Sequence, residues 1–255
     1  MNRVFGFLYV LLSVSPLFGQ GTDLLAIHQL NPDEVSIQLF ENEDSEIRIV
    51  TDPFLVRSIE FFENHPDLNL AGDFDGDGSD EIAVFTDLTY TPNKNPEFTC
   101  SVIKVYKSEG DRVAPHDTWF SAADSALDFS LVSYAVAADY NGDGLCDIAL
   151  LYNDPTREQV QIYVLLSTGE RFSEPLPYFV VDRDEFNFTA LSFASAGDFN
   201  GNGKTDLALF YNYFGTAPET KQAIFLLECT DSSFTLLPAA YTGTKQDYNF
   251  SELKN

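Results

Sequence analysis

The sequence predicts an all-β fold made of repeated four-stranded units, and three observations support this. An acidic, glycine-containing loop that runs into an apolar segment occurs three times, starting at Asp73, Asp139 and Asp198. Two short runs of β-branched and aromatic residues follow each loop, separated by turn residues, which is typical of strand hairpins. Outside the first residues, no segment has the sustained apolar period of a helix.

The three loops are near-identical in sequence. The copies read AGDFDGDGSDEIAVF, AADYNGDGLCDIALL and AGDFNGNGKTDLALF, and their first aspartates lie 66 and 59 residues apart. This period is the size of a repeated supersecondary unit. The segments that leave the loops, at 82–85, 148–152 and 207–211, are apolar at consecutive positions. We therefore expect them to be inner strands, covered on both faces by neighbouring sheets.

Each unit is expected to hold four antiparallel strands: one that enters the loop, one that leaves it, and a hairpin. The hairpin strands are predicted at 101–107 and 113–120, at 161–166 and 171–179, and at 223–228 and 234–241. The three units then extend near 68–120, 134–179 and 193–241. Long connections between the second and third strands are expected at 86–99, 153–159 and 212–221.

The N-terminal segment has the strand pattern of the same repeat unit. Residues 22–27 match 205–209, and residues 35–40 and 46–50 supply an outer hairpin, so 22–51 is predicted to be a partial unit. Four-stranded units that repeat radially are the blades of a β-propeller. The sequence therefore predicts about four blades, one of them incomplete, which either the two chain ends or a partner chain would complete.

Residues 1–19 are predicted to be a secretory signal peptide. Arg3 precedes an apolar stretch at 4–14, and Gly19 is a small residue at the expected cleavage point. The stretch is shorter than a comfortable membrane span, and no stop-transfer pattern follows it. The mature domain would be 20–255, secreted or periplasmic and without membrane insertion. An uncleaved anchor is the alternative.

Composition excludes several classes of partner. The chain has 40 acidic and 14 basic residues and a net charge of −26, so it lacks the basic surface that nucleic acids and anionic membranes require. Three cysteines are too few for a disulfide framework, and an odd number leaves at least one free thiol.

The loops have the ligand pattern of a calcium site. Calcium binds six to eight oxygens, and residues at positions 1, 3, 5 and 9 of each loop can supply carboxylate or amide oxygens, while glycine at position 6 permits the sharp turn. The candidate ligands are Asp73, Asp75, Asp77 and Glu81 in the first loop, Asp139, Asn141, Asp143 and Asp147 in the second, and Asp198, Asn200, Asn202 and Asp206 in the third. Asp80 is an alternative to Glu81, and acidic turns without an ion are the alternative to all three sites.

The number of carboxylates among these ligands falls from four to three to two along the chain. Because calcium affinity depends on ligand charge, the third site is predicted to be the weakest. A helix-loop-helix calcium hand is excluded, since it needs glutamate at position 12, where this chain has Val84, Leu150 and Leu209.

The shared pattern G-D-[FY]-[DN]-G-[DN]-G-x-x-[DE]-[IL]-A-[VL] resembles the FG-GAP/VCBS repeats of integrin-α-like β-propellers. The resemblance covers residue 22 to the C-terminus and is specific in all three loops. It implies up to three structural Ca²⁺ ions, one in each loop between the first two strands of a blade. Members of this family include adhesion receptors, sugar-binding propellers and some polysaccharide-cleaving enzymes.

Candidate ligand-binding residues lie in or beside the long connections. Tyr90, Tyr152, Tyr211 and Tyr213 have asparagine or aspartate close by, and tyrosine can stack on and hydrogen-bond a sugar or peptide. Ordinary packing is the alternative reading of these rings. We expect a secreted, calcium-stabilised module that binds an extracellular glycan or protein. A polysaccharide-acting enzyme and a partial propeller completed in an oligomer are the alternatives, and no catalytic residue is assigned.

Overall fold

The structure is a computed structural model that describes residues 8–12, 24–31, 34–43, 46–49, 54–57, 65, 68–90, 98–109, 112–113, 117–123, 126–213, 221–230, 232–247 and 250. Before residue 65, only the backbone of the strands is described. The chain divides into two compact units, residues 1–130 and 131–255, which are described separately. The described part contains no helix with the length and hydropathy that a membrane span requires.

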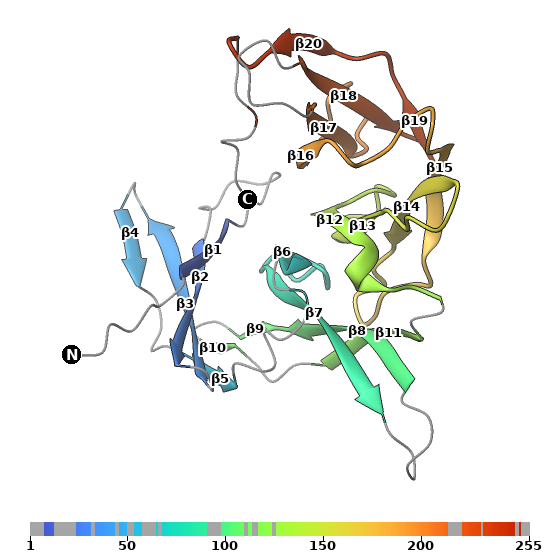
Figure 1. The fold of residues 1–255 in the computed structure, drawn as a ribbon. Helices are drawn as coiled ribbons and strands as arrows, with labels where there is room; N and C mark the ends of the chain where they lie inside the picture. Colours follow the sequence, from blue (N-terminus) through green and yellow to red (C-terminus); the bar gives the residue numbers. More distant parts are fainter. Residues whose placement is uncertain are drawn as a thin grey trace, which may run out of the picture. The chain divides into compact units, whose positions relative to one another are not determined.

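The N-terminal sheet of the first unit contains β1 (Leu8–Leu12), β2 (Leu24–Asn31), β3 (Glu34–Glu43), β4 (Glu46–Ile49) and β5 (Phe54–Arg57). The order is β1-β2-β3-β4, and β5 pairs with the other end of β3 (Figure 1). Strands β2, β3 and β4 confirm the strands predicted there. Strand β1 belongs to the segment predicted as a signal peptide, whose other residues lie outside the described ones. A chain cleaved after Gly19 would lack β1.

The first repeat sheet contains β6 (Leu70–Gly72), β7 (Glu81–Tyr90), β8 (Phe98–Tyr106) and β11 (Asp117–Ala123) in the order β11-β8-β7-β6. A small ladder of β9 (Ser108–Glu109) and β10 (Arg112–Val113) lies between β8 and β11 in the chain. The predicted connection 86–99 was too long. Strand β7 continues to Tyr90 and β8 begins at Phe98, because Thr89 pairs with Thr99 and extends the ladder beyond the apolar residues.

The second unit contains two repeat sheets. The second repeat sheet is β12 (Val132–Ala138), β13 (Asp147–Tyr152), β14 (Gln159–Leu165) and β15 (Leu176–Asp182), in chain order. The third is β16 (Leu191–Gly197), β17 (Asp206–Asn212), β18 (Lys221–Cys229) and β19 (Phe234–Leu236), and β20 (Tyr241–Thr244) also pairs with β18. The single predicted strand 234–241 is thus two strands, β19 and β20, which pair with different parts of β18. A short 3-10 helix, Phe129–Leu131, precedes β12.

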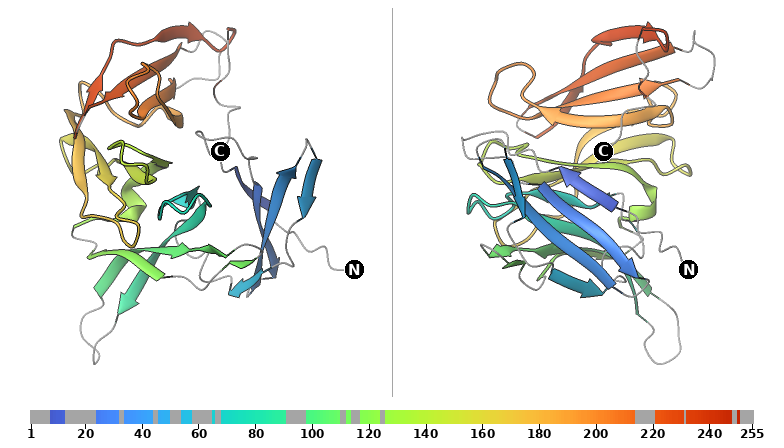
Figure 2. Two further views of the ribbon diagram at one scale, coloured as in Figure 1. Left: turned by 180° about the vertical axis from the view of Figure 1, so that it is seen from behind. Right: turned by 90° about the vertical axis from the view of Figure 1, so that its left-hand side faces the viewer.

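The second and third repeat sheets share one core and lie next to each other in both views of Figure 2. The core takes alternate residues of β13 and β14, such as Ala149, Leu151 and Ile162, and alternate residues of β17, such as Leu207 and Leu209. All six residues of β13 are buried, as predicted for an inner strand. The all-β class and the repeated antiparallel sheets are therefore as the sequence predicts.

Phe129, in the 3-10 helix, is the centre of an aromatic cluster on the first repeat sheet. Its ring lies 5.0 Å from that of Phe85 and 6.3 Å from that of Phe120, measured between centroids. The ring of His65 meets Phe129 edge-on, and its Nε2 lies 2.8 Å from Asp87 Oδ2. This histidine therefore packs and pairs within the sheet. None of the three cysteines, all of which lie in the described part of the chain, forms a disulfide.

Candidate metal centres in the repeated loops

The three loops have the same backbone geometry, set by the aspartate at position 1. In the first loop, Asp73 Oδ1 accepts a hydrogen bond from the N–H of Gly76 at 2.7 Å, and Oδ2 accepts one from Gly78 at 3.0 Å. Asp139 and Asp198 accept the equivalent pairs of hydrogen bonds. Both glycines have positive φ, 77° and 91° in the first loop, which a residue with a side chain rarely adopts. Glycine is thus required at position 4 as well as at position 6.

Positions 3 and 5 form successive side-chain turns. The side-chain oxygen of Asp75 accepts the N–H of Asp77 at 3.1 Å, and Asp77 accepts the N–H of Ser79 at 2.8 Å. The same two bonds occur in the second and third loops. One oxygen of each side chain therefore supports the turn. Backbone N–H groups of the loop therefore hold the side chains at positions 1, 3 and 5 in the same way in all three copies.

The acidic residue at position 9 connects the loop to the hairpin. Asp147 is buried, and its two oxygens accept the N–H groups of Tyr140 at 3.1 Å and Ser167 at 2.8 Å. Asp206 does the same with Phe199 at 3.1 Å and Cys229 at 2.8 Å. In the second and third loops, this carboxylate therefore has a structural role in addition to any metal that it binds.

Glu81 differs from these aspartates. It is fully buried, and its Oε2 accepts the N–H of Phe74 at 2.9 Å and that of Asp75 at 3.3 Å. Its Oε1 has no hydrogen-bond partner among the described residues. An unpartnered buried carboxylate oxygen is costly unless a cation or a proton compensates it.

The first loop also brings three carboxylates together. Ligand oxygens of Asp73, Asp75 and Glu81 lie within 4.8 Å of one another, which is found for no other group of three acidic, histidine or cysteine side chains among the described residues. Asp77 and the alternative Asp80 are not part of this group. The pKa of Glu81 is raised to about 8, mainly because the carboxylate is buried and secondly because of the negative charge of Asp75. This all-oxygen set, with one unpartnered oxygen, fits a hard cation such as calcium.

Lys107 is a cationic neighbour that the sequence did not reveal. Its Nζ lies 2.7 Å from Asp75 Oδ2, and this hydrogen bond raises the pKa of the lysine. The same Nζ lies 5.4 Å from the centroid of Trp119, the one tryptophan of the chain. Lys107 therefore links the acidic cluster to a tryptophan on β11. It lies 32 residues from Asp75, so only the strand register brings the two together.

The four candidate tyrosines lie in different environments. Tyr152 and Tyr211 are buried. Tyr152 packs edge-on against Tyr163, and the hydroxyl of Tyr211 donates to the carbonyl of Asn187 at 2.7 Å. This burial argues against a ligand-stacking role for both rings. Tyr213, in contrast, is 41% exposed, while the side chain of Tyr90 lies outside the described residues.

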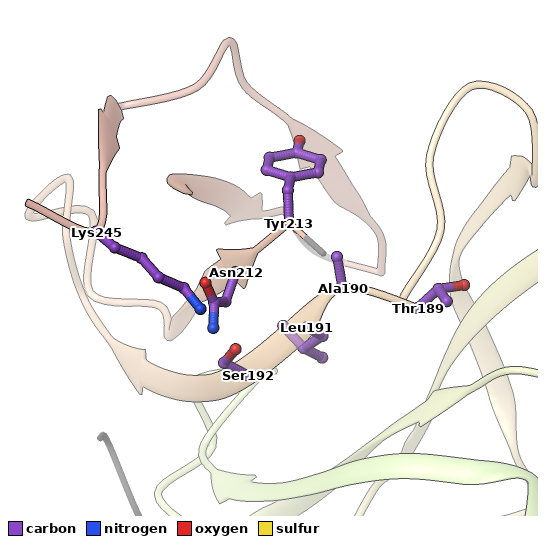
Figure 3. A pocket seen from close by; sticks show the side chains of 7 residues that line it. All are labelled: Thr189, Ala190, Leu191, Ser192, Asn212, Tyr213 and Lys245. Carbon is purple, nitrogen blue, oxygen red and sulfur yellow. The ribbon is translucent and has the colours of Figure 1, made fainter. Parts of the chain in front are cut away.

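Tyr213 lines a pocket of about 300 Å³ on the third repeat sheet, together with Thr189, Ala190, Leu191, Ser192, Asn212 and Lys245 (Figure 3). The ammonium end of Lys245 points toward Asn212 and Ser192, whereas the Tyr213 ring points away from them. At the matching place in the second sheet, the guanidinium of Arg183 donates to Asn153 Oδ1 at 2.6 Å. The third sheet thus has Lys245 at the position where the second has Arg183.

Part of the repeated region is similar to a known protein family. The model of the FG-GAP-like repeat family matches residues 139–209. This segment is similar to an FG-GAP-like repeat. The match begins at the first aspartate of the second loop and includes the whole third loop, so it confirms the resemblance predicted from the loop residues. The FG-GAP-like segment covers β13 to β16 and most of β17.

Two solved structures are similar to the chain at low identity. One is a rhamnogalacturonan lyase PL11 from Bacillus licheniformis, with 13% identity and a TM-score of 0.40 over 98% of this chain and 49% of that one. The other is the exotype rhamnogalacturonan lyase YesX, with 12% identity and a TM-score of 0.40 over 96% of this chain and 47% of that one. The chain thus spans about half the length of each. A search among curated proteins finds no match.

Proposed function

We propose that the protein is a calcium-stabilised β-propeller module that acts outside the cytoplasm and binds a carbohydrate or protein ligand. The observation that carries the calcium part is the unpartnered, buried Oε1 of Glu81 beside Asp73 and Asp75. In this proposal, Ca²⁺ supplies a fixed positive charge that holds the acidic loops together. The shared loop geometry supports equivalent, weaker sites in the second and third loops.

Trp119 gives a direct test of the first site. A calcium ion at Asp75 would compete with Lys107 for the carboxylate, and a displaced ammonium would no longer lie over the tryptophan ring. We therefore expect calcium titration of the metal-free protein to change the intensity or wavelength of tryptophan fluorescence, with saturation. The change should be lost in Asp75→Asn.

Lys107→Met provides the matched control for this titration. It removes the ammonium but no candidate metal ligand, so calcium should still bind while the fluorescence response becomes small. Calorimetric titration of the same variant separates loss of binding from loss of the optical signal. Unchanged fluorescence in wild type, together with no heat of binding, would contradict a calcium site in the first loop.

The ligand-binding part of the proposal rests on Tyr213 and its pocket. An exposed aromatic residue in the lining of a pocket that also contains amide, hydroxyl and ammonium groups matches the surfaces on which sugars and peptides stack and form hydrogen bonds. We expect Tyr213→Ala to weaken binding about 10- to 100-fold, the loss that one aromatic contact typically causes. Its thermal stability should stay close to that of wild type because the ring is exposed.

The experiment is a screen of soluble polysaccharides and extracellular matrix proteins against immobilised protein, with wild type, Tyr213→Ala and Tyr211→Phe compared. Tyr211→Phe removes only a buried hydroxyl, so it should lower stability by about 1 kcal/mol and leave binding unchanged. A depolymerisation assay on each bound polysaccharide distinguishes binding from cleavage. Equal binding by wild type and Tyr213→Ala would contradict a ligand site in this pocket.

A further inference from the structure

The third loop contains two successive Asn-Gly dipeptides, the sequence most prone to deamidation, which is the loss of a side-chain amide as ammonia. They are Asn200-Gly201 and Asn202-Gly203, and Asn141-Gly142 in the second loop is the only other Asn-Gly in the sequence. In this reaction, the backbone nitrogen of the glycine attacks Cγ of the preceding asparagine. Glycine permits the attack because it has no side chain to obstruct it. Asn200 and Asn202 are exposed, so water reaches both amides.

Deamidation needs only the chain itself and water. The glycine N–H loses its proton, a new bond from this nitrogen to Cγ closes a cyclic imide, and the bond from Cγ to the amide nitrogen breaks and releases ammonia. Water then opens the imide at either carbonyl carbon, which leaves aspartate or isoaspartate. The net change is hydrolysis of an amide to a carboxylate, with no oxidation or reduction. The reaction therefore depends on whether the glycine N–H is free to lose its proton and to approach Cγ.

A single carboxylate holds both glycine N–H groups of the third loop. Gly201 donates to Asp198 Oδ1 at 2.7 Å, and Gly203 donates to Asp198 Oδ2 at 2.9 Å. A proton held by a carboxylate is harder to remove, because the nitrogen anion would lie beside a like charge. The asparagine amides are held as well, since the Oδ1 of Asn200 and that of Asn202 each accept the N–H two residues further on, at 2.9 and 2.7 Å. Ring closure therefore requires this loop to open.

The second loop holds its Asn-Gly dipeptide in the same way, with its own aspartate. Gly142 donates to Asp139 Oδ1 at 2.6 Å, and the Oδ1 of the preceding asparagine accepts a backbone N–H at 2.8 Å. We propose that Asn200 and Asn202 are protected deamidation sites, and that the carboxylate of Asp198 is the group that protects them. Deamidation then occurs only when the loop opens locally, which proteins do more readily in exposed segments than in the core.

Deamidation would change the third loop in one of two ways. Aspartate at positions 3 and 5 gives this loop the residues that the first loop has there, Asp75 and Asp77, and raises the number of its candidate carboxylate ligands from two to four. Isoaspartate instead moves one carbon from the side chain into the backbone, which changes the spacing that lets one carboxylate accept both glycine N–H groups. Either product adds a negative charge. A transient opening of the loop is thereby converted into a permanent change of its charge.

Peptide mass spectrometry during incubation at mildly alkaline pH tests the proposal, with excess chelator in every sample so that no bound metal contributes. Folded wild type should lose the amides of Asn200 and Asn202 much more slowly than wild type in urea. Asp198→Ala should lose them at least ~10-fold faster than folded wild type, as expected when charge-assisted hydrogen bonds are removed. Asn141 is the control within the same molecule, because Asp139 still protects it, and its rate should not change. In Asp139→Ala the pattern should reverse.

Three results would overturn the proposal. The first is amide loss in folded wild type at the rate measured in urea, because the loop would then give no protection. The second is an unchanged rate at either Asn200 or Asn202 in Asp198→Ala. The third is equal acceleration at Asn141 in that variant, which would mean that the folded unit as a whole, and not the carboxylate, provides the protection. None of these results depends on calcium or on a ligand at Tyr213, so the proposed function is tested separately.

Discussion

Removal of calcium is expected to lower the thermal unfolding midpoint of this protein by several degrees for each site that was occupied. A ligand at a hundredfold excess over its dissociation constant stabilises the folded state by about 2.7 kcal/mol. For a chain of this size, each kcal/mol corresponds to a change of about 2–4 °C, so one site contributes about 5–10 °C. Scanning calorimetry with excess chelator and then with added calcium measures the difference. An equal midpoint under both conditions would contradict the calcium proposal.

This calcium effect should be larger at pH 8.5 than at pH 6. Burial raises the pKa of Glu81 from 4.5 to about 8 and that of Asp147 from 3.8 to about 7, so at pH 6 protons compete with calcium for both carboxylates. In chelator, these groups bind protons more tightly when folded than when unfolded. The stability that these two groups contribute to the metal-free protein is therefore fully present below about pH 4 and is lost as the pH rises through about 7 to 8.

Glu81→Gln is the informative variant for the same experiment. The amide keeps the size of the side chain and an oxygen for the N–H of Phe74, but removes the buried negative charge. In chelator at pH 8.5 we expect Glu81→Gln to be at least as stable as wild type, because no uncompensated charge is buried. With calcium it should be less stable than wild type. A variant that is less stable under both conditions would indicate a purely structural role for Glu81.

The second large effect is expected for Asp206→Ala. Its carboxylate accepts the N–H of Cys229 in a buried hydrogen bond and the N–H of Phe199 in a partly buried one, and both donors would lose their acceptor. Each unsatisfied buried group costs about 1–3 kcal/mol, so the expected loss is roughly 2–6 kcal/mol in urea unfolding. Because these donors are part of the protein, most of the loss should persist in chelator.

Asp184→Ala serves as the control for this substitution. Asp184 is exposed in the same unit and should change stability by less than about 0.5 kcal/mol. Asp206→Asn, which keeps one carbonyl oxygen, should fall between the two. A loss in Asp206→Ala that occurs only with calcium would show that the carboxylate acts through the metal and not through the two N–H groups.

Local patterns predicted most of the strands but not all of their lengths. The apolar runs after each loop located β7, β13 and β17, since side chains covered on both faces must be apolar. The extension of β7 to Tyr90 was missed because polar Thr86, Asp87 and Thr89 resemble a loop. In the structure, pairing with β8 satisfies their backbone groups.

The candidate sites were predictable only where the chemistry is local. Glycine spacing and alternate acidic residues located the loops, because both act within nine residues. The distant partners of Asp147, Asp206 and Asp75 lie 20, 23 and 32 residues away, respectively, so these contacts depend on strand register. The burial of Tyr152 and Tyr211 likewise depends on which sheet covers each strand end, which their neighbours in sequence do not encode.

The order of strands within the repeat sheets has a consequence for folding kinetics. Consecutive strands are neighbours in the ladders, for instance β12 to β15, so most pairings join segments that are close in the chain. Short loops close quickly and at low entropic cost, which allows each hairpin to form before distant segments are in place. A substitution in one sheet should thus change the folding rate mainly of that sheet. Growth of structure from several nuclei is the expected behaviour of such an array.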